Sequence, residues 1–356
     1  MMETNAGLSG PELLEYTKEV RPMKLGILGA GAIARVMSDT IRKMQASGHK
    51  EVELYAVAAR DLDRAQAFAD KEGVARAYGS YEALLEDPAV DFVYIATPHS
   101  HHYRHLKLCI DHGKAVLCEK PFTVTARQAE DVFRYAREKG VLVTEAIWTR
   151  YQPMRRMITA ALNSGVIGTP KLITANLGYP MLHKPRIVDP ALAGGALLDV
   201  GIYALNFTDM FFGAPDSVQG FCTKYETGVD LNDSVTLTWE DGRAAHLTSS
   251  ANSVTDRQGA IYGDKGFLLV TNINNPQQFR IVDGDYKVIQ SVDCPPQLTG
   301  YEYEVLEMAD SLNKGLLECP SMPHRDTLRL MQIMDELRAQ MGIRYPCEGV
   351  DDDATL

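Results

Sequence analysis

Residues 23–34 read Met-Lys-Leu-Gly-Ile-Leu-Gly-Ala-Gly-Ala-Ile-Ala. The run 24–28, apolar after its first residue, predicts a short buried strand, and the residues from Ile33 onward predict a helix. Between them lies the pattern G-x-G-x-x-A, in the strand–turn–helix context that a dinucleotide-binding fingerprint requires. Its glycines permit a tight turn and a close approach to a pyrophosphate, and its small third residue lets helix pack on strand. A purely structural turn would show the same pattern. The residues expected to hold a dinucleotide are Gly29, Ala30, Gly31, Ala32, Ile33 and Ala34.

Strand-like and helical patterns alternate up to about residue 145. The sequence predicts further strands at 53–59, 90–96, 115–118 and 141–144, and helices at 33–46, 61–71, 81–85, 101–112 and 125–139. Strands that alternate with helices in this way form a parallel, doubly wound sheet. We therefore expect a Rossmann-type domain over residues 22–145. It follows a polar leader, residues 1–21, in which 11–19 suggest a short helix.

The pattern changes after residue 145. A helix at 155–163 is followed by closely spaced strand-like runs at 171–176, 218–225, 234–239, 244–250, 260–262, 267–271 and 279–282. Such spacing predicts a mostly antiparallel sheet. Helical patterns return at 301–312 and 324–341. The expected fold class is α/β: a doubly wound parallel sheet, then an α+β domain at 146–356 whose last helix could pack back on the first domain.

Composition narrows the classes of function. The 356 residues are 45% hydrophobic and 23% charged, as in an ordinary soluble protein, and the net charge is −11. A negative chain has little nonspecific affinity for nucleic acid or an anionic membrane, so we expect neither as a partner. No apolar run approaches the ~20 residues of a membrane span. Six cysteines without a C-x-x-C pair indicate reduced thiols and a cytoplasmic protein.

The end of the second predicted strand bears on cofactor choice. A cofactor with a free 2′-hydroxyl usually meets an Asp or Glu there. Here the strand ends at Arg60, with Arg64 one helical turn later. A guanidinium suits a 2′-phosphate because it binds phosphate in a fork geometry and stacks on adenine. This favours NADP over NAD. Asp61 could still hold a ribose, and Arg60 could be a solvated side chain.

The third and fourth predicted strands end in residues that could meet a ligand. The first of these ends carries Thr97, Pro98, His99 and His102, and the second carries Glu119, Lys120 and Pro121. Both lie at carboxyl ends of parallel strands, where open α/β sheets bind ligands. Lys120, between a strand end and a proline, would be a fixed cation beside the cofactor, although a structural ion pair with Glu119 is also open.

Four histidines lie between residues 99 and 105, and His101 and His105 are one helical turn apart. Neutral imidazoles at that spacing can bind a metal ion. No carboxylate or cysteine completes a ligand set nearby, so we expect no metal.

Asp199 and Tyr203 are four residues apart in the otherwise apolar stretch 194–203. That spacing places both side chains on one helix face. An aspartate in apolar surroundings needs a partner, and Tyr203 or Lys120 would serve. A lysine cation beside Tyr203 would lower the tyrosine pKa, which is useful for proton transfer at an alcohol or carbonyl oxygen. Tyr203 could also be a core aromatic residue.

Together these motifs resemble the Gfo/Idh/MocA oxidoreductase family over residues 23 to about 342. The similarity is closest to its dihydrodiol dehydrogenase branch, on account of residues 145–150, Glu-Ala-Ile-Trp-Thr-Arg, and 189–195, Asp-Pro-Ala-Leu-Ala-Gly-Gly. The resemblance implies NADP-dependent oxidation or reduction of a sugar, polyol or cyclic diol. It also implies an open-faced second sheet that makes a homodimer, or a dimer of dimers. His99 departs from the asparagine that often follows Thr-Pro.

Roles follow from the resemblance only where residues match. Lys120 would polarise the reacting oxygen, Tyr203 would be the acid/base, and Asp199 would support that pair. Substrate would meet Lys120, Trp148, Arg186 and Tyr203. The cofactor would contact the fingerprint and Arg60, Arg64, Thr97, Pro98, His99, His102, Glu119, Lys120, Trp148 and Arg150.

Two other functions remain open from the sequence. Some proteins of this fold are glycosidases that retain the nicotinamide without net redox change, and others are sugar-sensing regulators. Regulators would be expected to lose Lys120 or Tyr203, and both are present. The actual substrate rests on the loop 179–189, where His183, Lys184 and Arg186 could contact hydroxyl or carboxylate groups or simply be solvated.

Overall fold

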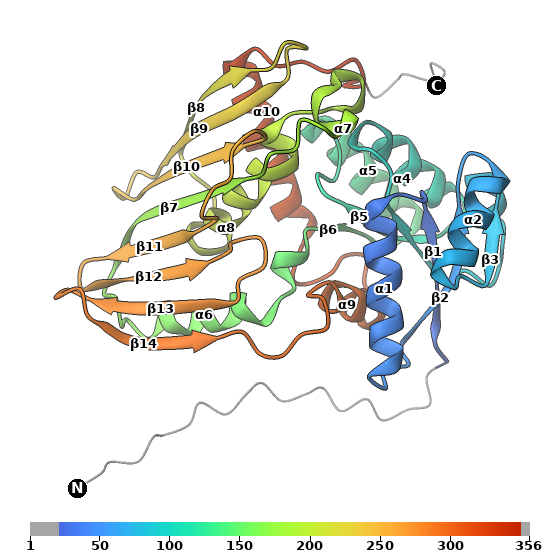
Figure 1. Ribbon diagram of the computed structural model, residues 1–356, viewed down its shortest axis with the longest axis horizontal. Coiled ribbons are helices and arrows are strands. Elements are labelled where there is room, and N and C mark those ends of the chain that lie inside the picture. Colours follow the sequence, from blue (N-terminus) through green and yellow to red (C-terminus); the bar gives the residue numbers. More distant parts are fainter. Residues whose placement is uncertain (1–20, 350–356) are drawn as a thin grey trace, which may run out of the picture.

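The computed structural model describes residues 21–349 and contains two sheets side by side (Figure 1). The first has the strand order β3-β2-β1-β4-β5-β6, and every pairing in it is parallel. This is the order of a dinucleotide-binding fold, with a topological switch between β1 and β4. The predicted doubly wound parallel sheet is confirmed. Its strands are β1 (Met23–Leu28), β2 (Val52–Ala58), β3 (Arg76–Tyr78), β4 (Phe92–Ile95), β5 (Ala115–Glu119) and β6 (Val143–Ala146).

Helices connect these strands, and side chains cap several of their N-termini. Asp61, Ser80 and Thr125 each accept a hydrogen bond from a backbone N–H in the first turn of α2, α3 and α5. Gly73 and Gly140 end α2 and α5 in the left-handed conformation that glycine adopts most easily. The elements are α1 (Ala32–Ala46), α2 (Leu62–Glu72), α3 (Tyr81–Leu85), the 3₁₀ turn η1 (His99–His101), α4 (His102–Asp111) and α5 (Ala126–Lys139).

The second sheet has eight strands in the order β14-β13-β12-β11-β7-β10-β9-β8. All its pairings are antiparallel except β7 with β10, so the predicted mostly antiparallel sheet is confirmed. The strands are β7 (Pro170–Gly178), β8 (Ser217–Lys224), β9 (Asp230–Thr238), β10 (Ala244–Ser250), β11 (Gly259–Gly263), β12 (Gly266–Thr271), β13 (Gln278–Asp283) and β14 (Val288–Asp293).

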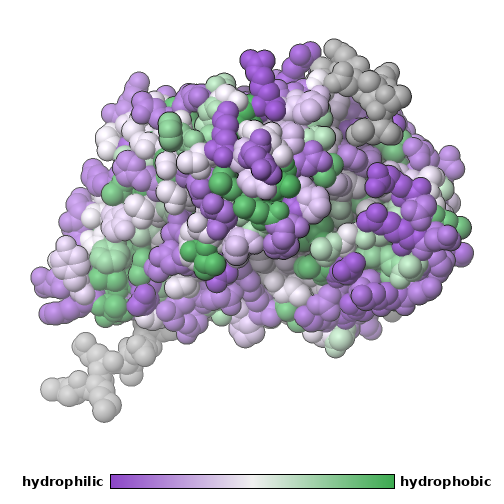
Figure 2. All heavy atoms as spheres, turned by 45° about the horizontal axis from the view of Figure 1, so that its top comes forward, coloured by the Kyte–Doolittle hydropathy of each residue, from purple (hydrophilic) through white to green (hydrophobic). Residues whose placement is uncertain are grey.

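Helices cover one face of this sheet, and alternate residues of β8–β10 are exposed on the other. Polar residues dominate the molecular face drawn in Figure 2, where apolar groups are small and separated. The remaining elements are η2 (Trp148–Arg150), α6 (Pro153–Asn163), α7 (Pro185–Val188), η3 (Pro190–Leu192), the π-helix η4 (Leu197–Gly201), α8 (Ile202–Phe212), α9 (Glu302–Asn313) and α10 (His324–Met341).

Helix α10 lies between the two sheets' layers and contacts both α5 and β8. On one side, the backbone N–H of Ala126 donates to Asp335 over 2.8 Å, and the His324 ring stacks on Phe133. On the other, a Cβ at Gly220 would lie 2.4 Å from Leu337, so β8 can approach α10 this closely only with glycine there.

The structure differs from the sequence predictions at the sheet edges. Strands β3 and β14 were not predicted, because β3 has three residues and β14 is mostly exposed without apolar alternation. Strand β6 begins two residues later than predicted, at Val143. The leader helix expected at 11–19 lies outside the described residues. Pro190–Phe212 is long and apolar enough to cross a membrane, but 89% of its apolar window is buried, as in a core helix.

Candidate active site

The turn after β1 suits a pyrophosphate. Gly29 has a positive φ of +103°, and a Cβ there would lie 2.9 Å from the carbonyl oxygen of Ala96 at the end of β4. Helix α1 begins after Gly31 with no side-chain cap and no acidic residue in its first turn. Its free N–H groups and positive dipole end are therefore available to an anion at the switch between β1 and β4. The residues present fit a bound dinucleotide.

The ends of β4 and β5 are held together by buried polar contacts. The ring nitrogens of His102 lie 2.8 Å from the Pro121 carbonyl oxygen and 2.9 Å from that of Thr97. Burial lowers the His102 pKa to about 4, so the neutral ring has one N–H and donates it to one of these two carbonyl oxygens. The buried ring lies between these loops and helps to position them, and its contact with a cofactor stays a prediction.

Glu119, also expected near the cofactor, is buried and accepts a hydrogen bond from the Tyr94 hydroxyl. Its other oxygen accepts from the backbone N–H of Lys120 at 3.1 Å. Burial raises the Glu119 pKa. Tyr94 had no signal in the sequence beyond an apolar strand. The half-buried Thr97 contacts His105, with 2.9 Å between Oγ1 and Nδ1, and it precedes the half-buried Pro98.

Lys120 and Asp199 meet where the two sheets adjoin. The Lys120 ammonium donates to the Asp199 carbonyl oxygen at 2.6 Å and to its carboxylate at 3.2 Å. Arg186 donates to the same carboxylate at 2.6 Å, and His99 Nε2 lies 3.7 Å from it. Burial disfavours the charged carboxylate, but Lys120 and Arg186 outweigh that effect and hold the Asp199 pKa well below its usual range. Lys120 thus serves as the partner that Asp199 needed.

Tyr203 follows one turn after Asp199 and is 7% exposed. The Lys120 ammonium lies 5.1 Å from the centre of its ring. The Tyr203 hydroxyl oxygen accepts a hydrogen bond from Trp148 Nε1 at 3.0 Å, and the Trp148 ring stacks on Tyr301 with 4.1 Å between ring centres. Among residues 21–349 the hydroxyl hydrogen of Tyr203 meets no acceptor, so it is left to donate to a bound oxygen.

The Tyr203 pKa corrects one prediction. The sequence suggested that Lys120 would lower it, but burial raises it well above its ordinary value, and Tyr301 and Glu119 add to the increase. The hydrogen bond from Trp148 opposes this rise. At neutral pH Tyr203 is therefore a neutral phenol. Tyr301 was not found from the sequence, since no local motif surrounds it.

The two arginines after β2, Arg60 and Arg64, are both exposed. Arg60 and Arg64 both lower the pKa of Tyr81, whose net rise comes from burial, and Arg60 also lowers that of His101. The carboxylate of Asp61 accepts a hydrogen bond from the Arg64 N–H at 2.8 Å, so it caps α2.

Arg150 lies apart from these groups. It is 2% exposed, and its guanidinium binds Asp209, Asp326 and the Asn206 side chain. All three partners lie on α8 or α10, so Arg150 joins these helices to η2. Its guanidinium is thus engaged in a buried ion network, and the cofactor contact stays a prediction.

The histidine cluster has no metal-binding geometry. No group of three or more His, Cys, Asp or Glu side chains within residues 21–349 could hold a metal ion. The rings of His101 and His105 lie edge to face with 5.8 Å between their centres.

Comparison with known proteins agrees with this geometry. The sequence model of the Gfo/Idh/MocA family, an oxidoreductase family with an NAD-binding Rossmann fold, matches residues 23–147, and that of the family's C-terminal domain matches 155–269. The chain belongs to the Gfo/Idh/MocA oxidoreductase family. The resemblance drawn from the sequence is confirmed.

Relatives within the Gfo/Idh/MocA family span nearly the whole chain. Trans-1,2-dihydrobenzene-1,2-diol dehydrogenase of Mus musculus is 36% identical over 336 residues, which cover 91% of this chain and 98% of that protein. The Homo sapiens enzyme is 35% identical over 331 residues, with the same coverage. Among solved structures, the 3-ketoreductase KijD10 from Actinomadura kijaniata, in complex with NADP and TDP-benzene, is 26% identical with a TM-score of 0.80. That match covers 90% of this chain and 98% of KijD10.

Proposed function

We propose that this chain is an NADP-dependent oxidoreductase that transfers hydride between the cofactor and a secondary alcohol or ketone of a sugar, polyol or cyclic diol. One observation carries the proposal: Lys120, Asp199 and Tyr203 converge at the carboxyl end of β5, in the same parallel sheet whose first strand leads into the uncapped helix α1. The named activities of the relatives, a diol dehydrogenase and a 3-ketoreductase that was solved with NADP, support this class of substrate.

The choice of NADP rests on the end of β2. Arg60 and Arg64 offer two exposed guanidinium groups, and the carboxylate that would bind a ribose 2′-hydroxyl is engaged as the cap of α2. Guanidinium groups bind phosphate with paired hydrogen bonds. The fingerprint Gly29–Ala34 would hold the pyrophosphate, and Thr97, Pro98, His99 and Trp148 would border the nicotinamide.

The cofactor, when bound, supplies the hydride chemistry. The Lys120 ammonium lies 3.2 Å from the Asp199 carboxylate, and it would donate to the reacting oxygen. In ketone reduction, Tyr203 would give its free hydroxyl hydrogen to that oxygen. In alcohol oxidation Tyr203 must first lose its proton to solvent, which the hydrogen bond from the Trp148 N–H would favour. Because burial raises the Tyr203 pKa, oxidation should gain from alkaline pH.

Substitution of Lys120 or Tyr203 tests these roles. We expect Lys120→Met and Tyr203→Phe each to lower kcat by a factor on the order of 10²–10⁴, since each removes a group that acts on the reacting oxygen. NADPH binding and thermal unfolding should stay close to wild type. Lys139→Met and Tyr262→Phe, both away from the site, serve as matched controls. Near-normal turnover in either active-site variant would reject its role.

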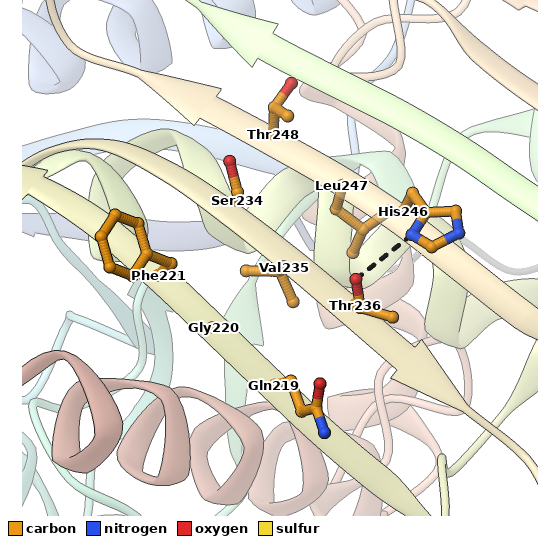
Figure 3. Close-up of a pocket in the computed structure, with 9 residues that line it drawn as sticks. All are labelled: Gln219, Gly220, Phe221, Ser234, Val235, Thr236, His246, Leu247 and Thr248. Atoms are coloured by element: carbon orange, nitrogen blue, oxygen red, sulfur yellow. Dashed lines mark hydrogen bonds between the residues drawn. The ribbon is translucent and has the colours of Figure 1, made fainter.

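We further propose a cytoplasmic homodimer, or a dimer of dimers, assembled through the exposed face of the second sheet. A hollow of about 330 Å³ lies on that face and is lined by residues of β8, β9 and β10, whose side chains Figure 3 shows. One of them, Phe221, is 74% exposed. An exposed aromatic side chain on a flat sheet favours contact with another apolar surface. Light scattering should give at least twice the mass of one chain, and a single-chain mass would contradict the proposal.

A further inference from the structure

Two aspartates of β9 point to the same side of the sheet. Lys224 pairs with Asp230 and Thr223 pairs with Asn232, so the intervening residue Leu231 forms a bulge with no partner on β8. The bulge breaks the two-residue alternation, and Asp230 and Asp233 both become buried, at 1% and 2% exposure. They lie beneath the start of the helical run that carries Asp199 and Tyr203.

Each carboxyl group uses one oxygen and leaves the other without a partner. Asp230 Oδ2 accepts from the backbone N–H of Leu197, the first residue of η4, and Asp233 Oδ2 accepts from the Ser249 hydroxyl. Within residues 21–349, the Oδ1 atoms of both are buried and meet no donor. Two ionised carboxylates in this position would repel each other.

We propose that Asp230 and Asp233 share one proton across their Oδ1 atoms, and that this acid pair fixes the start of the helix that presents Asp199 and Tyr203. Asp233 carries the proton and donates it to Asp230. Asp230 remains charged, which suits an anion at a helix N-terminus. Burial and the charge of Asp230 raise the Asp233 pKa well above its ordinary value, in agreement with this arrangement.

The backbone before and within η4 passes very close to Asp230 and to Ser249. Gly195 has a φ of +115°, and a Cβ there would lie 2.1 Å from Asp230 Oδ1. A Cβ at Gly201, the last residue of η4, would lie 2.9 Å from the Ser249 hydroxyl oxygen. The helical run is therefore closely packed near both ends of η4, against Asp230 before its start and against Ser249, the hydrogen-bond partner of Asp233, at its end. Both aspartates are positioning residues, because they act on the site through this helix and not on a ligand.

Other titratable groups around the pair do not change charge near neutral pH. Cys222 faces it from β8, and burial raises its pKa to about 11. Tyr345, which follows α10, has a pKa raised well above its ordinary value by burial. Arg338 on α10 stays charged and paired with Asp335 and Glu348. A proton bound or released here between pH 5 and pH 7 thus belongs to Asp230 and Asp233.

The shared proton is tested by the pH dependence of unfolding in wild type and Asp233→Asn. The asparagine amide can donate to Asp230 and its oxygen can accept from Ser249, so it reproduces protonated Asp233 without a titratable proton. Wild-type unfolding releases this proton, because a solvated aspartate is ionised above about pH 4. The unfolding constant of wild type relative to Asp233→Asn should therefore rise roughly tenfold for each pH unit between about pH 5 and pH 7.

The exposed Asp264→Asn serves as the matched control and should not change the pH slope. Parallel pH dependence of wild type and Asp233→Asn would show that no proton is shared, and would overturn the proposal.

The positioning role has a separate readout, the emission of Trp148, whose N–H binds Tyr203. In a Trp239→Phe background Trp148 is the sole tryptophan. Asp233→Asn should leave the Trp148 emission unchanged, whereas Asp233→Ala should shift it. If Asp233→Ala does not fold, Ser249→Ala takes its place and should shift the emission as well. Equal emission in all folded variants would reject the positioning role. Neither measurement uses a substrate or cofactor, so both are independent of the proposed function.

Discussion

Burial and the N–H of Trp148 shift the pKa of Tyr203 in opposite directions. Burial stabilises the neutral phenol, whereas the Trp148 N–H stabilises the phenolate that alcohol oxidation requires. A hydrogen bond of this kind contributes about 1 kcal/mol, which corresponds to roughly one pH unit in a pKa. The Trp148 ring is in turn held against Tyr301, so the donor is well fixed.

Trp148→Phe removes this donor. Because the phenolate loses its partner, the Tyr203 pKa should rise further, and the pH at which alcohol oxidation reaches half its maximum should move up by about one unit. The pH profile of kcat/KM checks this. Trp239→Phe, the other tryptophan of the chain, is the control. A profile that does not move would show that Trp148 does not tune Tyr203.

At the scale of elements, the run from η4 through α8 places the chemistry. The chain enters this helical run through Gly194 and Gly195. A Cβ at Gly194 would lie 2.5 Å from the Ile187 carbonyl oxygen. The Tyr345 hydroxyl also donates to the Gly194 carbonyl oxygen at 2.6 Å. The close path of this loop fixes where the helix begins, and hence where Asp199 and Tyr203 lie.

Alanine at Gly195 should be more destabilising than alanine at Gly213, at the far end of α8. Both glycines have positive φ, which costs an alanine about 1–2 kcal/mol, but at Gly213 nothing lies within 4 Å of the new Cβ. At Gly195 the contact with Asp230 should add about 1–3 kcal/mol. Urea unfolding of the two variants measures the difference. Equal loss of unfolding free energy would contradict the close contact.

Elements with a strong periodic signal could be predicted from the sequence, and those without one could not. Residues 24–34 predict a strand, a turn and a helix because apolar residues and glycines fall at the required positions. Strand β14 lacks this signal because its side chains are mostly exposed. The π-helix at 197–201 follows from contacts with β9 and β10, and these come from residues distant in the sequence.

The residues of the candidate site likewise divide into those that a sequence motif indicates and those that it does not. Lys120, Asp199 and Tyr203 lie in short motifs and could be chosen from them. Tyr301 and Tyr94 could not, because only the fold brings them to the site. Arg150 lies in a recognisable motif, yet its three polar partners on α8 and α10 turn it into the core.

At the scale of the whole molecule, the site lies where two sheets of different kinds adjoin. The parallel sheet contributes the fingerprint, Lys120 and His99. The segment between β7 and β8 of the second sheet contributes Arg186, Asp199 and Tyr203. Helix α10 contacts both layers. Hydride transfer needs cofactor and substrate in contact, and this arrangement brings one binding surface from each sheet to a common edge.

The proposed function depends most on the identity of the cofactor. Fluorescence titration measures the affinities for NADPH and NADH side by side. Wild type should bind NADPH more tightly, and Arg60→Asp should weaken NADPH binding far more than NADH binding, because it removes a partner of the 2′-phosphate. Lys71→Asp, an exposed change at the other end of α2, should alter neither. Preference of wild type for NADH, or equal losses in Arg60→Asp, would contradict the proposed phosphate site. Binding of neither cofactor by folded, cofactor-free protein would contradict the oxidoreductase itself.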